Sequence, residues 1–169
     1  MLTQQQIQML IALPKTIVEK RPSQGYREEN GSRRCDLDLQ SGGKDDDGAF
    51  TVFVRQNLMF MENFSIGLCY RKTDLGIGKF NLIRYNGPHG ERSRSPDGHY
   101  AKSHIHRISE QDLASGSTQP QERDRTITDR YATLEEALPV FFRKIAVSNH
   151  HQYFPNFSQL QLRLSYEHQ

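Results

Sequence analysis

The chain lacks the long hydrophobic runs and the strong net charge that would assign it to a membrane or to a polyanion. A run of about 18 or more apolar residues is missing, so we expect no membrane-spanning helix. The chain begins Met1-Leu2-Thr3-Gln4-Gln5-Gln6, without the basic and apolar segments of a secretory signal, and this favours a cytoplasmic protein. The formal net charge is +2, so any electrostatic argument depends on how charge is distributed locally.

Cysteine is scarce, and several familiar catalytic motifs are missing. The two cysteines, Cys35 and Cys69, each lie in a strand-like run, and we expect both to be reduced core residues. The sequence contains no paired-cysteine zinc pattern, no phosphate-binding loop of the Walker type and no nucleophile elbow. We therefore expect neither a metal nor a cofactor.

What the chain does contain is a series of strand-like segments followed by one clear helix. Alternating polar and apolar residues within 33–108, joined by short links, predict an antiparallel meander of about five to six strands. Thr133 and Glu136 form a capping-box pattern ahead of an apolar face, which predicts a helix over 133–149. A short helix is also expected over 3–13. It is followed by a link at residues 15–19 and a loop at residues 22–34.

These elements together predict a single α+β domain, because 169 residues leave room for one hydrophobic core. Its expected parts are an N-terminal helix and loop over 1–30, the meander over 33–108, a mobile loop over 109–125, the helix over 133–149 and an alternating segment over 160–166 that suits a last strand. The exposed strand edges of such a meander invite strand addition, so a homo-oligomer is one alternative to a monomer.

Basic residues and histidines gather between Arg84 and Arg107. This stretch holds five lysines and arginines against two carboxylates, a local charge of five minus two, or +3, while the whole chain carries +2. Cations bind phosphates and aromatic rings stack on bases, which favours contact with RNA or DNA. The candidate contact residues are Tyr85, Arg92, Arg94, Tyr100, Lys102 and Arg107. The competing interpretation is an ordinary solvated loop.

Two histidines one residue apart supply the candidate chemistry of this stretch. In a strand, His104 and His106 point to the same face of the sheet. Histidine titrates near neutral pH, so this pair suits an acid and a base acting on a phosphodiester, with Arg84 and His89 holding the phosphate. The alternatives are two structural histidines, or a metal site completed by His89 or His99. We set the metal aside because carboxylates and cysteines at ligand spacing are nearly absent.

A family resemblance covers roughly residues 50–147. It rests on Asn63-Phe64-Ser65-Ile66-Gly67-Leu68-x-Tyr70, Arg84-Tyr85-Asn86-Gly87-x-His89, His104-Ile105-His106 and Thr128-Asp129-Arg130-Tyr131 ahead of Glu136-Ala137-Leu138. In these segments the chain resembles a bacterial family of small proteins of unknown function. The resemblance implies a fold and no activity.

A looser resemblance is to the small toxins of toxin–antitoxin pairs. They also follow a strand-borne Arg-Tyr with Pro-His and a later His-x-His, and the resemblance implies action on RNA. This chain differs from them, because Asn86-Gly87 stands before Pro88 where they have an acidic–amide pair, and the insertion up to His104 also differs. Function inferred from such a resemblance is analogy.

Two functions follow from these observations. The first is a toxin-like ribonuclease or RNA-directed protein of a bacterial toxin–antitoxin or defence system, with a phosphate site built from histidine and arginine. The alternative is a non-catalytic module that binds nucleic acid or a cognate partner protein and whose histidines are structural. The sequence does not decide between an enzyme and a binding module.

Overall fold

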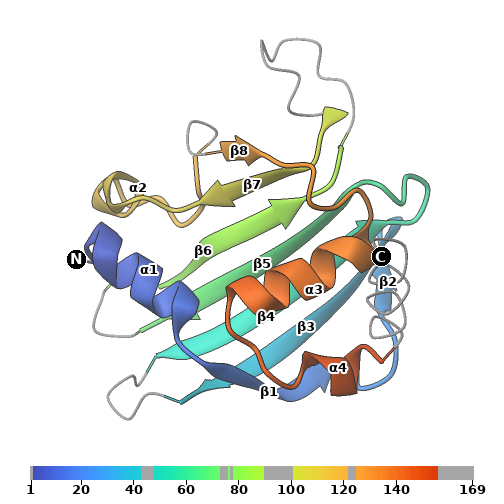
Figure 1. Ribbon diagram of the computed structural model, residues 1–169, viewed down its shortest axis with the longest axis horizontal. Helices are drawn as coiled ribbons and strands as arrows, with labels where there is room; N and C mark the ends of the chain where they lie inside the picture. The colour runs from blue at the N-terminus through green and yellow to red at the C-terminus, as the bar shows by residue number, and fades with distance from the viewer. Residues whose placement is uncertain are drawn as a thin grey trace, which may run out of the picture.

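One antiparallel sheet, with helices packed on one of its faces, organises the chain. A computed structural model describes residues 2–42, 48–72, 76, 78–89, 101–121 and 125–155. Over this part of the chain there are eight strands and four helices, so the expected α+β class is confirmed. Helices α1, α3 and α4 lie in front of the sheet in the view of Figure 1.

The strands follow one another across the sheet as a meander with one added edge strand. They are β1 (Lys15–Arg21), β2 (Arg27–Glu29), β3 (Ser32–Ser41), β4 (Ala49–Asn57), β5 (Phe64–Arg71), β6 (Lys79–Asn86), β7 (His104–Arg107) and β8 (Arg125–Ile127). The order is β1-β3-β4-β5-β6-β7-β8, and β2 pairs with β3. The antiparallel meander is confirmed, but eight strands replace the expected five to six.

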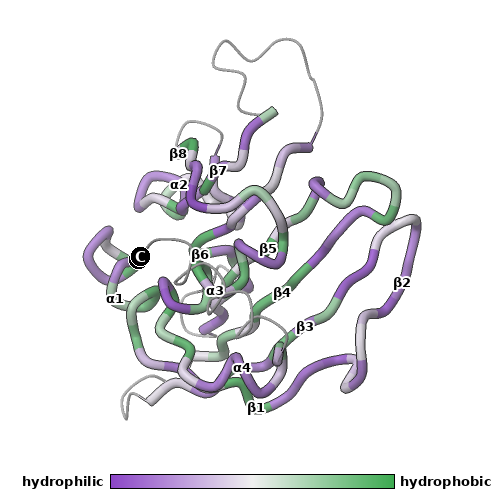
Figure 2. The backbone as a smooth tube through the Cα atoms, turned by 45° about the vertical axis from the view of Figure 1, so that its right-hand side comes forward, coloured by the Kyte–Doolittle hydropathy of each residue, from purple (hydrophilic) through white to green (hydrophobic). Residues whose placement is uncertain are grey.

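The additional strands lie at the edges, where sequence patterns are weakest. Residues 15–19 belong to β1 and not to a link, and residues 22–34 contain β2 and the start of β3. Edge strands have few buried positions: β2 is exposed throughout, and only Lys15 and Ile17 of β1 are buried. Figure 2 shows a hydrophilic β2, whereas hydrophobic and hydrophilic positions follow one another along β3 and β4.

The core lies between the sheet and the helices. Leu37, Val52, Leu68 and Ile83 stand side by side on β3, β4, β5 and β6, and all four are fully buried. Each such side chain contributes about 1.5–3 kcal/mol by leaving water. This continuous apolar row fixes the register of the central strands, because a slip by one residue would turn it outward.

The helices follow their capping signals. Helix α1 (Gln4–Ala12) begins after its N-cap Thr3, and α3 (Leu134–Lys144) begins after its N-cap Thr133. The helix expected over 133–149 is shorter, because Ala146 adopts a positive φ of 54° that ends it, and α4 (His150–Tyr153) follows separately. Helix α2 (Glu110–Ala114) lies within the loop expected over 109–125. The segment expected to form a last strand lies outside the described residues.

A buried lysine joins the ends of two helices. Lys15 is 2% exposed, and its ammonium group lies 4.7 Å from the centroid of the Phe50 ring. Its Nζ donates to the carbonyls of Leu10, Ile11, Leu13 and Ile145, at 2.8, 3.1, 2.6 and 3.3 Å. The positive charge therefore satisfies carbonyl groups at the C-terminal ends of α1 and α3.

Both cysteines are free thiols and buried, as the sequence predicts. Cys35 lies in the core, where burial raises the pKa of its thiol to about 11. Cys69 lies on the opposite face of the sheet and donates to Asn81 Oδ1 at 2.6 Å. Among the described helices, none is both long and apolar enough to cross a bilayer.

Candidate nucleic-acid interface

The face of the sheet turned away from α1, α3 and α4 carries the candidate site, and we call it the open face. Strand alternation places every second side chain here. One row across β3 to β7 consists of Arg34, Arg55, Ser65, Asn86 and His104, and the next consists of Asp36, Phe53, Gly67, Arg84 and His106. The core residues Cys35, Val54, Ile66, Tyr85 and Ile105 lie between these rows and point to the helices.

Two hollows adjoin one another on the open face. The inner hollow, of about 350 Å³, is lined by Arg34, Phe53, Arg55, Ser65, Cys69, Lys79, Asn81, Arg84 and Gln119. The outer hollow, of about 660 Å³, is lined by Arg21, Pro22, Arg27, Arg34, Asp36, Thr51 and Lys79. Because Arg34 and Lys79 line both, the two hollows form one path across β1, β2, β3, β4, β5 and β6.

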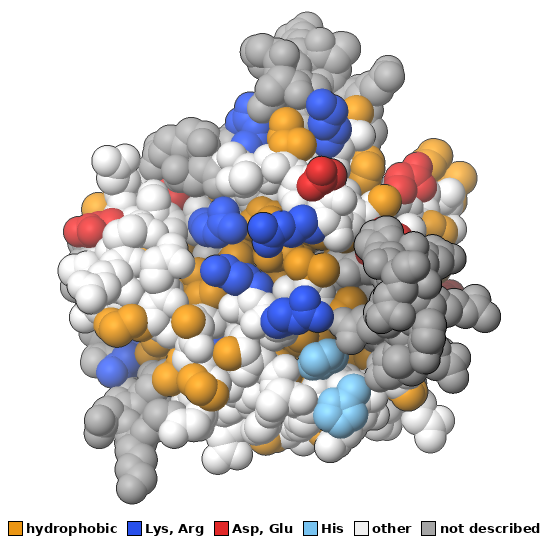
Figure 3. Space-filling model, in the orientation of Figure 1, with side chains coloured by type: hydrophobic (Ala, Val, Ile, Leu, Met, Phe, Trp, Pro, Cys, Tyr) orange, Lys and Arg blue, Asp and Glu red, His pale blue; other side chains and the backbone are white. Residues whose placement is uncertain are grey.

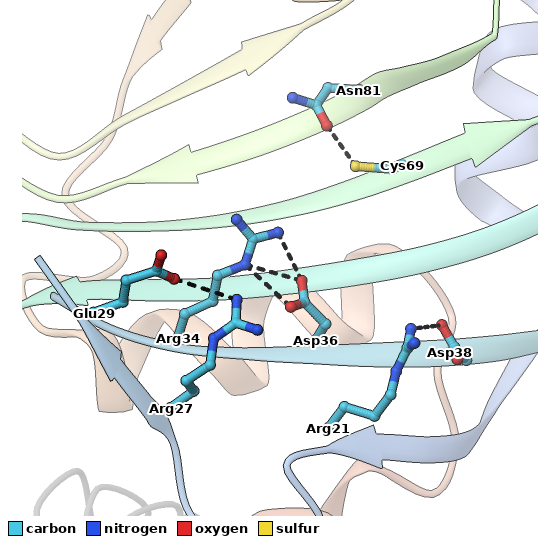
Figure 4. Close-up of polar contacts among 8 residues, drawn as sticks. All are labelled: Arg21, Arg27, Glu29, Arg34, Asp36, Asp38, Cys69 and Asn81. Carbon is cyan, nitrogen blue, oxygen red and sulfur yellow. Dashed lines mark hydrogen bonds and ion pairs between the residues drawn. The ribbon is translucent and has the colours of Figure 1, made fainter.

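Ion pairs orient the arginines of the outer hollow. Figure 4 looks onto the open face and shows Arg34 directed at Asp36, with Nη2 2.8 Å from Oδ1. The hydrogen bond to Asp36 raises the pKa of Arg34. Two further pairs appear in the same view, Arg21 with Asp38 at 2.8 Å and Arg27 with Glu29 at 3.6 Å. These carboxylates lie within ion-pair distance of the guanidinium groups and cancel part of their charge.

The inner hollow is more strongly basic. Four of its lining residues, Arg34, Arg55, Lys79 and Arg84, are cations, and no aspartate or glutamate of the described chain lines it. Arg55 and Lys79 are exposed, whereas Arg34 and Arg84 are half-buried. Like charges around a concave surface attract an anion and release its counterions, so this arrangement suits phosphate groups.

Three histidines, whose convergence the sequence left open, lie close together beside Arg84. His104 Nε2 lies 3.3 Å from His89 Nε2, and the rings of His104 and His106 are 5.0 Å apart. His106 stands directly opposite Arg84 in the register of β6 and β7. His99, the other histidine of the stretch, lies outside the described residues.

The hydrogen bonds of His104 define its tautomer. Its Nδ1 lies 2.8 Å from the carbonyl oxygen of Lys102, which accepts only, so Nδ1 carries a proton. Its Nε2 lies 3.3 Å from the amide nitrogen of Asn86, which donates, so Nε2 accepts in this contact. Asn86 in turn accepts from Ser65 Oγ at 2.7 Å. A hydrogen-bonded path therefore runs from the inner hollow, through Ser65 and Asn86, to His104.

Burial separates the histidines into two groups. His104 is 0% exposed and His106 is 1% exposed, whereas His89 is half-buried at the end of the cluster. Tyr131 supports the cluster from the helix side, since its hydroxyl donates to the carbonyls of His104 and Asn86 at 3.0 and 3.3 Å. His104 and His106 are therefore part of the packed interior of the sheet, and His89 is the one of the three that is accessible to solvent.

None of the expected nucleic-acid contacts that the structure describes lines the two hollows of the open face. Tyr85 is 3% exposed on the helix side and stacks on Tyr131, with ring centroids 5.4 Å apart, so its ring is not accessible to a base. Arg107 also lies on the helix side, because it pairs with the core residue Ile83. Lys102 is exposed beside β7. The other candidates, Arg92, Arg94 and Tyr100, lie outside the described residues.

Sequence reasoning missed the cations that come from distant strands. Arg34, Arg55 and Lys79 meet Arg84 only after the strands pair, so no local motif marks them. A weak signal exists for Arg34 and Arg55, because each stands one position from a buried apolar residue in an alternating strand. A comparison of the polar positions of all the strands would have identified these cations as neighbours.

The helix side also carries basic side chains. Figure 3 shows lysines and arginines gathered over the region of α3 and histidines beside them. Arg143 and Lys144 lie exposed in the last turn of α3, where cations stabilise the negative end of the helix dipole. Their position therefore has a structural explanation, and they offer matched controls for the open face.

Comparison with known proteins adds no support from a relative to the candidate site. No family model, curated protein or solved structure matches the chain. The resemblance to the bacterial family and to the toxins therefore stays a prediction. Within the described residues, no group of three or more histidines, cysteines or carboxylates gathers closely enough to hold a metal ion.

Proposed function

We propose that the protein binds nucleic acid along its open face. The observation that supports this is the convergence of Arg21, Arg27, Arg34, Arg55, Lys79 and Arg84 on two adjoining hollows. They come from five strands, and α1, α3 and α4 pack on the other face of the sheet. A strand of phosphates fits such a path, because each cation that contacts a phosphate releases counterions.

In this proposal His104 and His106 are structural. Both imidazoles are buried, so a polymer cannot contact them while the fold is intact. The bond of His104 to Asn86 joins β7 to β6, the strand that carries Arg84, and the bond to the Lys102 carbonyl fixes the other nitrogen of the ring. Burial thus favours the binding module over an enzyme that uses these two histidines as acid and base.

The salt dependence of binding tests the proposal. Fluorescence anisotropy with a labelled oligoribonucleotide is measured over a range of potassium chloride concentrations. We expect the logarithm of affinity to fall with the logarithm of salt, with a slope of about 0.7 for each phosphate contacted on a single strand. A flat slope, or no binding at low salt, contradicts the proposal.

Matched charge removals locate the binding face. The Arg55→Gln, Lys79→Gln double variant removes two exposed cations from the inner hollow, and Arg143→Gln, Lys144→Gln removes two from α3. We expect the first to weaken binding and to lower the salt slope by about 0.7 for each phosphate that is no longer neutralised. The second is expected to bind as the parent does. The reverse order places the site on the helix side and overturns the proposal.

A second candidate function is cleavage of RNA at His89. The observation in its favour is the 3.3 Å separation between His89 Nε2 and His104 Nε2, which couples a half-exposed histidine to a fixed acceptor. His89 then acts as acid or base on a phosphodiester held by Arg84. RNA is incubated with the parent, with His89→Gln and with His151→Gln, each with and without a chelator. Cleavage by the parent and by His151→Gln, lost only in His89→Gln, supports this function, and an inactive parent rejects it.

The cellular role in a toxin–antitoxin or defence system is proposed on the resemblance alone. Expression of the parent in a bacterial host is expected to slow growth, and the Arg55→Gln, Lys79→Gln variant to relieve that effect. Equal growth with the parent and an empty vector contradicts the toxin role. A cognate partner protein and a homo-oligomer stay predictions.

A further inference from the structure

We propose that the inner hollow takes an unpaired base, stacked on Phe53, so that the ligand class is single-stranded nucleic acid. This inference rests on the proposed function and adds the class of its ligand. Phe53 is the sole aromatic residue among those described that line this hollow. It stands on β4 in the open-face row between Asp36 and Gly67, and its side chain is half-buried.

The ring of Phe53 fills the space where a residue other than glycine at position 67 would place its side chain. A Cβ built on Gly67 would overlap the Cε1 and Cζ atoms of Phe53, so the ring lies over the backbone of β5. Because Gly67, the residue paired with Phe53, has no side chain, the ring packs against the backbone of the neighbouring strand. A ring supported in this way offers a firm platform for stacking.

Cations surround this platform. The guanidinium carbon of Arg34 lies 5.7 Å from the centroid of the Phe53 ring, within the range of a cation–π contact. Arg84 pairs with Gly67, the residue beneath the ring, and Arg55 pairs with Arg34. A base on Phe53 therefore has basic groups on several sides, as the phosphates before and after it in a chain require.

The ring is what distinguishes a single strand from other polyanions. Bases in a duplex are paired and stacked on one another, so a duplex offers its phosphates but no free base face to a ring on a sheet. Polyphosphate offers charge and no base at all. Oligoribonucleotides and oligodeoxynucleotides share the free base face, and the 2′-hydroxyl is the group that separates them.

The absence of tryptophan from the chain allows a direct test of stacking. Phe53→Trp places a single tryptophan in the inner hollow, and Phe60→Trp places one at an exposed position outside it. Each variant is titrated with a single-stranded oligoribonucleotide, the matching oligodeoxynucleotide, their duplexes and polyphosphate. We expect single strands to quench the tryptophan at 53, and we expect duplex and polyphosphate to leave it unchanged. The tryptophan at 60 is expected to respond to none of them.

Substitutions of the ring give a second measurement. Phe53→Leu keeps an apolar side chain and removes the ring, and Phe53→Tyr keeps the ring. Stacking energies per base predict a loss of about tenfold in single-strand affinity for Phe53→Leu. Phe53→Tyr is expected to bind as the parent does, and polyphosphate affinity and the salt slope are expected to stay unchanged in both variants.

The outcomes separate this inference from the function on which it rests. If the parent binds no oligonucleotide, whether or not it binds polyphosphate, the proposed function fails. If the parent binds single strand and duplex equally, or binds while the tryptophan at 53 is not quenched, the open face binds polyanions and the stacking inference alone is overturned. Quenching by oligoribonucleotide alone identifies RNA, and equal quenching by both single strands assigns the site to either nucleic acid.

Discussion

At the scale of a single residue, we expect the buried ammonium group of Lys15 to contribute strongly to stability. Lys15→Met removes the donor to carbonyl groups at the ends of α1 and α3 and keeps much of the side-chain volume. We expect the free energy of unfolding to fall by about 3 kcal/mol, because buried carbonyls lose a charged donor. Urea unfolding measures this, and Lys144→Met, at an exposed site, is the control. Equal stability of both variants would contradict the account of Lys15.

Buried thiol and phenol groups make the stability sensitive to alkaline pH. Burial raises the pKa of Cys35 from 9.0 to about 11 and that of Tyr26 from 10.0 to about 12. A group whose pKa is higher in the folded state binds its proton more tightly there. Its contribution is therefore complete below the unfolded pKa and is lost as pH rises toward the folded pKa.

We therefore expect the free energy of unfolding to decline from about pH 9 to pH 11, the interval between the two pKa values of Cys35. Urea unfolding of the parent and of Cys35→Ala across this range measures the decline. The variant starts from lower stability, because it leaves a small cavity in the core, but its decline is expected to be shallower. A parent whose stability rises above pH 9 would contradict this assignment.

Residues that carry the family resemblance have structural roles in this chain. Asn86 links Ser65 to His104 through hydrogen bonds. Gly87 passes so close to the carbonyl oxygen of Glu62 that a Cβ there would overlap it. These residues therefore determine how β5, β6 and β7 pack together. The sequence alone does not distinguish such a structural role from a catalytic role.

At the scale of elements, α3 depends on its N-terminal cap. Thr133 Oγ1 accepts from the amide of Glu136 at 3.2 Å, and the Glu136 carboxylate accepts from the amides of Ala132 and Thr133 at 2.7 and 3.3 Å. Thr133→Ala is expected to lower the free energy of unfolding by about 1 kcal/mol. Thermal unfolding measures the loss, and Thr133→Ser, which keeps the hydroxyl, is expected to restore most of it. A serine variant as unstable as the alanine variant would argue against the cap.

The same elements show what the sequence can predict. Capping boxes and alternation are local, so α1, α3 and the central strands were predictable. The edge strands β1, β2 and β8 were not, because they bury few residues and show little alternation. Strand geometry predicted that His104 and His106 share a face, but the approach of His89 to His104 and the burial of His104 depend on tertiary packing, which no local pattern records.

At the scale of the whole molecule, the two faces of the sheet have separate roles. The helix side contains the apolar core and the charges at helix ends, and it determines stability. The open face contains the two hollows and their cations, and it determines binding in the proposed function. Substitutions of exposed residues on the open face should therefore change affinity without changing the free energy of unfolding by more than about 0.5 kcal/mol.

A titration followed by nuclear magnetic resonance tests the central claim most directly. Isotope-labelled protein is titrated with a single-stranded oligonucleotide, and the shifts of the backbone amides are mapped onto the fold. We predict that the largest shifts fall at Arg34, Phe53, Arg55, Lys79 and Arg84, around the inner hollow. Shifts concentrated instead at Arg143 and Lys144, with the open face unchanged, would contradict the account.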